Sequence, residues 1–184
     1  MVVYIHGAGG SASEAEFYRE IFSEDVIGLD YKSNTPWDFK EETKVFFEEN
    51  KDIVLIANSI GAYFAMLCNF SFRKAFLISP VVDMKRLIEG MMRERNISLK
   101  ELEEKKVIAD LSWDYYTFAC NNIPHINSIA HIAYGEFDNL TSLKTISSFA
   151  KENNATLDIL KNGEHYFHTP EEMDFLANWI SKYK

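Results

Sequence analysis

The sequence predicts an α/β protein with one open sheet of six parallel strands and helices on both faces. Short apolar runs rich in β-branched residues alternate with longer segments of helical spacing, and this alternation is typical of a parallel sheet. The chain has 184 residues, of which 47% are hydrophobic and 26% charged. That size and composition fit one globular core, so we expect a single domain over residues 1–184.

The expected elements follow one another along the chain. Strands are expected at Val2–Ile5, Val26–Asp30, Ile53–Ala57, Ala75–Ser79, Ile129–Tyr134 and Thr156–Leu160. Helices are expected at Ala12–Phe22, Phe39–Asn50, Ile60–Asn69, Thr141–Asn153 and Pro170–Tyr183. Thr35 and Thr169 each precede a proline, which is typical of a helix start because proline is favoured at the first helical position.

The stretch from Met84 to Asn127 interrupts this rhythm. It has no strand-like run, and charged segments in it give way to the aromatic LSWDYYTFACNN. Connections this long in compact domains are often functional, so we predict a small helical lid at residues 84–127, over the carboxyl ends of the strands. The alternative is an irregular crossover whose aromatic residues pack on the core.

The net charge of −9 argues against nucleic-acid or anionic-membrane partners, since either needs a basic face. A small-molecule substrate or a protein partner, including a second copy in a homodimer, is left open. Only two cysteines occur, Cys68 and Cys120, and we expect both to be buried, reduced thiols. The first residues, MVVYIHG, contain no basic segment and too short an apolar run for a signal or membrane helix, so we expect a cytoplasmic protein.

The run IVLIANSIGAYFAML, which begins at Ile53, predicts a strand, a tight turn at Ser59 and a helix. Ala57 and Gly61 are small, as a sharp strand-to-helix turn requires. Such a turn exposes the Ser59 hydroxyl and the N–H of Ile60 at a helix N-terminus, where developing negative charge is favoured. The alternative is that Ser59 only caps the helix.

The loop IHGAGGS, from Ile5 to Ser11, follows the first predicted strand. Glycine-rich loops between a strand and a helix often hold phosphate, so a nucleotide site is one interpretation. The loop has no lysine of the Walker type, and its glycines do not fit G-x-G-x-x-G.

Two later loops also follow predicted strands. Asp138 in AYGEFDNLTS can orient a histidine or cap the next helix, and Glu136 and Asp83 are the neighbouring alternatives. The loop KNGEHYFHT contains His165 and His168, but H-x-x-H without a third ligand is weak evidence for a metal site.

Together these motifs resemble those of the α/β-hydrolase superfamily. A-N-S-I-G resembles its nucleophile elbow G-x-S-x-G, with Ala57 in place of the first glycine, and H-G-A-G-G resembles its oxyanion loop. The order Ser59, Asp138, His165 is also the order of that superfamily. The resemblance covers nearly the whole chain, lacks the usual N-terminal pair of strands and points to a small bacterial member.

The resemblance implies a Ser-His-Asp triad of Ser59, His165 and Asp138, with His168 as the alternative base. It implies oxyanion donors at Ala8 and Ile60, and we expect Gly9 and the lid residues Trp113 and Tyr116 to contact the substrate. The expected activity is hydrolysis of small carboxylic esters through an acyl-enzyme, with a small-molecule acyl substrate and without metal or organic cofactor. Thioesters, small amides or peptides are alternative substrates, and a non-catalytic binding protein is the alternative of another class.

Overall fold

The computed structural model describes all residues, Met1 to Lys184. Its centre is one sheet of six parallel strands in the order β2-β1-β3-β4-β7-β8. The strands span Val2–Ile5 (β1), Val26–Gly28 (β2), Val54–Asn58 (β3), Lys74–Ile78 (β4), Ile129–Gly135 (β7) and Thr156–Leu160 (β8). The predicted fold class is confirmed.

The order of the strands explains why the motifs converge. β1 pairs with β3, β3 with β4, β4 with β7 and β7 with β8, all in parallel, so the loops after β1, β3, β7 and β8 leave the same edge of the sheet. Every residue of β1 is buried, as are the first four of β3, because helices cover both faces. Loops that leave the carboxyl ends of parallel strands are the usual place for a ligand site in such sheets.

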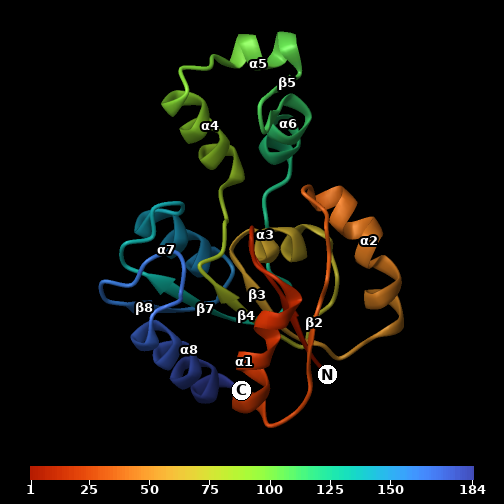
Figure 1. Cartoon of the computed structure of the whole chain (residues 1–184), viewed down its shortest axis with the longest axis vertical. Coiled ribbons are helices and arrows are strands. Elements are labelled where there is room, and N and C mark those ends of the chain that lie inside the picture. The colour runs from red at the N-terminus through yellow and green to blue at the C-terminus, as the bar shows by residue number, and fades with distance from the viewer.

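Five helices cover the two faces of the sheet (Figure 1). α1 (Ala15–Phe22) and α8 (Pro170–Tyr183) pack together on one face. α2 (Pro36–Glu49), α3 (Ser59–Leu67) and α7 (Leu143–Glu152) pack on the other. None of the helices combines the length and apolar character that crossing a membrane would need.

The helix boundaries differ from prediction where capping decides them. α2 begins at Pro36 rather than Phe39, because the side chain of Thr35 accepts the N–H of Asp38 and the proline occupies the first turn. The helix expected from Ala12 is divided into a 3-10 turn, η1 (Ala12–Glu14), and α1.

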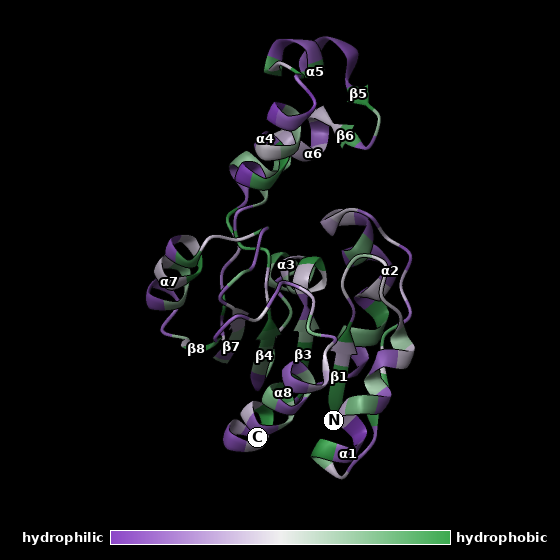
Figure 2. Cartoon of the chain, turned by 60° about the vertical axis from the view of Figure 1, so that its left-hand side comes forward, coloured by the Kyte–Doolittle hydropathy of each residue, from purple (hydrophilic) through white to green (hydrophobic).

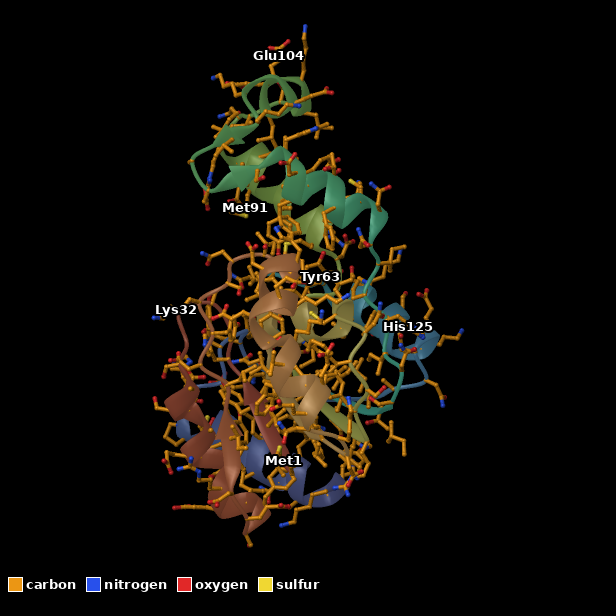
Figure 3. The ribbon with its side chains drawn as sticks, turned by 90° about the vertical axis from the view of Figure 1, so that its right-hand side faces the viewer. Met1, Lys32, Tyr63, Met91, Glu104 and His125 are labelled. Carbon is orange, nitrogen blue, oxygen red and sulfur yellow. The ribbon has the colours of Figure 1, made fainter.

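Residues between β4 and β7 form a separate projection, which stands clear of the sheet at the top of Figure 1. It contains α4 (Met84–Glu94), α5 (Leu99–Lys105) and α6 (Trp113–Asn121). We call residues 84–121 the lid segment, after the lid predicted at residues 84–127; that it covers the strand ends stays a prediction. Figure 2 shows α5 as mainly hydrophilic, and in Figure 3 Glu104 of the lid segment lies at the opposite end of the molecule from Met1.

The expectation that this stretch has no strand was wrong. β5 (Val107–Ile108) and β6 (Leu111–Ser112) form a small antiparallel hairpin. Two-residue strands are too short to produce a recognisable alternation in the sequence. The expectation for Cys120 was also wrong, because this residue of α6 is exposed whereas Cys68 is buried; both are free thiols.

Candidate active site

Ser59 lies at the sharp junction of β3 and α3, in a left-handed conformation with φ of 52°. The small neighbours that the sequence provides are needed here. A Cβ on Gly61 would lie 2.2 Å from the carbonyl oxygen of His6, and a Cβ on Gly7 would lie 3.1 Å from the Cβ of Ser59. The junction is therefore packed directly against the first glycine-rich loop, and strain of this kind is typical of functional turns.

The hydroxyl of Ser59 meets the imidazole of His165. Ser59 Oγ lies 2.8 Å from His165 Nε2, although 106 positions separate the two residues in the sequence. Both are buried, with exposed fractions of 7% for Ser59 and 2% for His165. His165 belongs to the loop between β8 and α8, so the sheet brings together the ends of two distant strands.

On its other side His165 meets Asp138. His165 Nδ1 lies 2.7 Å from Asp138 Oδ2, and both side chains are almost completely shielded from solvent. The carboxylate has only acceptors when ionised, so it fixes Nδ1 as the protonated nitrogen and leaves Nε2 free to accept the Ser59 proton. The three side chains thus form one continuous hydrogen-bonded line.

Asp138 also organises its own loop. Its Oδ1 accepts the backbone N–H of Leu140 at 2.8 Å and of Thr141 at 2.9 Å. Asp138 therefore both caps its own loop and contacts the histidine, so each of the two interpretations from the sequence describes a contact that it makes. The cap of α7 itself is Ser142, which accepts the N–H of Thr145.

The alternative acids and the alternative base make other hydrogen bonds, although His168 lines the same cavity as Ser59. Asp83 caps α4 by accepting the N–H of Arg86, and Glu136 accepts the N–H of Asn162. His168 is exposed, and its Nδ1 lies 2.7 Å from the carbonyl oxygen of Tyr166. His165 and His168 form no group of three metal-ligating side chains with a third residue.

Two backbone N–H groups, of Ile60 next to Ser59 and of Ala8 in the lining of the same cavity as Ser59, are candidate donors to a ligand. Ile60 is in the first turn of α3, and the residue before the turn, Asn58, makes no side-chain capping bond. First-turn N–H groups have no partner within their helix, so that of Ile60 is available to a ligand. The N–H of Ala8, in the exposed part of the first loop, is likewise absent from the internal hydrogen bonds.

A ring contact holds this first loop in place. The imidazole of His6 stacks on Tyr31 at 4.3 Å, and the Tyr31 hydroxyl donates to the carbonyl of His6. His6 is thus a structural residue of the loop, and it makes no hydrogen bond to Ser59 Oγ.

A cavity of about 500 Å³ opens beside Ser59. Ala8 and Gly9 line it, but the lid residues Trp113 and Tyr116 do not. The ring centroids of Trp113 and Tyr116 lie 5.7 Å apart within α6, and the Tyr116 hydroxyl donates to Glu89 of α4. Contact of these two rings with a substrate stays a prediction.

Glu172 lies in the first turn of α8, and its buried carboxylate also holds the histidine loop. It accepts the N–H groups of Glu164, His168 and Thr169 at 2.9 to 3.0 Å. Burial raises the pKa of this carboxyl group, but those hydrogen bonds outweigh it and lower the pKa to about 2. The T-P-E-E motif signals the cap, whereas the bond to Glu164 is visible only in three dimensions.

Solved structures with the same architecture are numerous, whereas no family model and no curated protein matches the chain. A suspected hydrolase from Agrobacterium vitis S4 superposes with a TM-score of 0.76 at 16% identity, over 98% of this chain and 86% of that one. A monoacylglycerol lipase from Paleococcus ferrophilus gives 0.69 at 14% identity, over 99% and 92%. An esterase from Exiguobacterium antarcticum gives 0.65 at 14% identity, over 98% and 90%.

These likenesses identify the architecture. The sheet order, the turn at Ser59 and the structural neighbours together show that the chain has the fold of the α/β-hydrolase superfamily. At such low identity the likeness defines the fold, and the chemistry has to be argued from the site itself.

Proposed function

We propose that the protein is a serine hydrolase that cleaves small carboxylic esters through an acyl-enzyme intermediate. The observation that carries the proposal is the line of hydrogen bonds from Asp138 through His165 to Ser59, at 2.7 and 2.8 Å. Nucleophilic catalysis by serine requires this arrangement, in which the nucleophile contacts a base and the base contacts a residue that orients it.

Each residue of the line has a defined task in the reaction. His165 Nε2 takes the proton of Ser59 Oγ as this oxygen attacks the ester carbonyl, and a tetrahedral intermediate forms. The imidazolium then gives the proton to the departing alcohol oxygen, which leaves an acyl group on Ser59. Water attacks this acyl-enzyme after losing a proton to the same nitrogen, so that the acid is released and the hydroxyl is restored. Asp138 stabilises the imidazolium in both halves.

The negative oxygen of each tetrahedral intermediate needs donors that are already in place. The N–H groups of Ala8 and Ile60 are the candidates. Ile60 follows Ser59 in the first turn of α3, and Ala8 lines the same cavity as Ser59 and makes no backbone hydrogen bond through its N–H. Loss of one donor of this kind costs about 3 to 4 kcal/mol of transition-state stabilisation.

The alternative substrates share this machinery. Thioesters and small amides or peptides pass through the same intermediates, and a type II thioesterase is among the structures of the same fold, at a TM-score of 0.61. The second alternative is a non-catalytic binding protein. Such a protein would not need a serine, a histidine and an aspartate that are buried and hydrogen-bonded in a line. The alignment of these three side chains therefore favours an enzyme.

Hydrolysis of p-nitrophenyl esters of graded chain length tests the proposal. We expect turnover that Ser59→Ala abolishes while the circular-dichroism spectrum and the unfolding midpoint are retained. Turnover that survives Ser59→Ala would place the nucleophile elsewhere. Comparison with matched thioesters and anilides then ranks the substrate classes by kcat/KM.

A further inference from the structure

The cavity beside Ser59 has a wall of mixed chemistry that points to a substrate class. We infer that it holds the acyl group of the substrate, and that it selects acyl groups with a hydrogen-bond donor, such as an ammonium group, over those with a carboxylate. This inference rests on the proposed function and concerns the specificity of the same site.

The sheet itself forms the floor of the cavity. Tyr4, Asn58 and Ile78 come from the neighbouring strands β1, β3 and β4, and all three line it. Tyr4 is aligned with Ile56, and Asn58 with Ile78. Because side chains two apart on a strand share a face, these residues point to the face covered by α1 and α8. The cavity therefore lies on that face and not under the lid segment.

Apolar side chains from the two helices form its walls. Phe17 lies on α1, Met173 and Leu176 lie on α8, and Phe167 precedes α8. Walls of this kind favour the carbon chain of an acyl group by removing apolar surface from water.

One of the lining residues, the exposed Glu14 of η1, carries a carboxylate. Glu14 accepts the Tyr4 hydroxyl on Oε2 and the N–H of Ser11 on Oε1, the latter at 2.9 Å. Both donors are neutral, and burial raises the pKa of Tyr4, which keeps its hydroxyl protonated. A carboxylate with two occupied lone pairs can still accept further hydrogen bonds.

No lysine or arginine lines the cavity to balance Glu14. Its one histidine, the exposed His168, has Nδ1 2.7 Å from the carbonyl oxygen of Tyr166 and 3.6 Å from the carboxylate of Glu172. Asn58 adds a polar side chain that makes no capping bond, directly before Ser59. A ligand with a donor group thus gains an acceptor, whereas a ligand carboxylate meets a like charge.

The position of His165 indicates which part of an ester occupies the cavity. The departing alcohol must receive its proton from His165 Nε2 and so must lie against the imidazole. The cavity is lined by Ser59 and by the loop residues Gly7 to Gly10, but His165 is not among its lining residues. The acyl side of the scissile bond therefore faces the cavity.

Three p-nitrophenyl esters of similar length test the inference: 6-aminohexanoyl, heptanoyl and pimeloyl. In the wild type we expect kcat/KM for the aminohexanoyl ester to exceed that for the pimeloyl ester at least about fivefold, the size of a partly exposed charge interaction. Glu14→Gln should bring this ratio close to one. Both kcat/KM values in the ratio are measured on the same variant, so a smaller folded fraction lowers both equally and leaves the ratio unchanged.

Glu20→Gln is the matched control, since Glu20 is an exposed carboxylate of α1 that does not line the cavity. It should keep the wild-type ratio. A wild-type ratio near one, or a ratio that Glu14→Gln leaves unchanged, would overturn the inference while the hydrolase proposal stands.

A binding measurement distinguishes failure of this specificity inference from failure of the proposed function. If no ester is cleaved, the proposed function fails, but calorimetry with n-hexylammonium and hexanoate still examines the cavity. Binding of the ammonium that Glu14→Gln weakens would support the recognition of donor groups. Equal binding of both ions, or of neither, would overturn it.

Discussion

The carboxylate of Glu172 accepts the backbone N–H of Glu164 at 3.0 Å, and so joins the first turn of α8 to the residue directly before His165. The same carboxylate accepts the N–H of His168 and of Thr169, which follow His165. The loop that presents the imidazole is thereby held on both sides by one buried side chain. Glu172 makes no hydrogen bond to Ser59 or Asp138, so its role is to position the loop that carries His165.

Glu172→Gln should lower both stability and kcat. The amide keeps one acceptor oxygen but loses the charge-assisted bonds, at a cost of about 1 to 3 kcal/mol in the free energy of unfolding at pH 7. The folded-state pKa of about 2 lies below the ordinary value of 4.5. The ionised carboxylate therefore stabilises the fold above pH 4.5, and this contribution is lost as the pH falls towards 2.

Urea unfolding of both proteins between pH 7 and pH 2 provides the measurement. We expect the difference in unfolding free energy to be largest at pH 7 and to shrink steadily below pH 4.5. Glu171→Gln, at the exposed neighbouring position, should change neither stability nor kcat. A stability difference that is constant across this pH range would contradict the role assigned to Glu172.

Asp138→Asn should leave the fold intact but lower kcat/KM by about 10³-fold to 10⁴-fold. The asparagine oxygen can still accept the N–H groups of Leu140 and Thr141. Its amide nitrogen would then face His165 Nδ1 and favour the tautomer that cannot accept the Ser59 proton. Glu136→Gln in the same loop is the control for ester turnover, and activity similar to wild type in Asp138→Asn would exclude Asp138 as the orienting acid.

Ser59→Gly should be more stable than Ser59→Ala by about 1 kcal/mol, although neither variant should turn over esters. The backbone of Ser59 has φ of 52°, where any side chain with a Cβ is strained and glycine is not. Thermal unfolding of the two variants checks this, and equal midpoints would mean that the turn stores no strain.

Gly61→Ala should destabilise the protein by about 3 kcal/mol or more, or prevent folding, since overpacking against backbone cannot be relieved by a rotamer change. The new Cβ would lie 2.2 Å from the carbonyl oxygen of His6 and 2.8 Å from Ile5 Cγ2. Gly90→Ala in α4 is the matched control, because its Cβ meets only Arg93 Nη2, at 3.8 Å. That helical position should gain up to about 1 kcal/mol from the same substitution.

The sheet and the meeting of Ser59, Asp138 and His165 could be predicted because they depend on local patterns. Alternation of strand and helix fixes a parallel sheet, and in such a sheet the loops after the strands share one edge. Boundaries were less predictable where a single cap decides them, as Thr35 does for α2.

The cavity was not predictable, because its wall depends on how distant elements pack. Glu14 in the sequence signals only the start of a helical turn, and its bond to Tyr4 requires β1 and η1 to be in place. Trp113 and Tyr116 of the lid segment are expected to contact substrate because they are apolar and belong to a lid predicted over the carboxyl ends of the strands. They do not line the cavity, and their contact with substrate stays a prediction. In the structure Tyr115 packs against Trp37 of α2, with 5.7 Å between the ring centroids.

Labelling of the folded protein with a fluorophosphonate, followed by peptide mass spectrometry, tests the central claim most directly. Such probes react with a serine whose hydroxyl is activated by a base and whose oxyanion is stabilised. We predict one adduct, on Ser59, which Ser59→Ala removes and Asp138→Asn slows strongly. Folded wild-type protein without an adduct, or with the adduct on another residue, would contradict the assignment of Ser59 as an activated nucleophile.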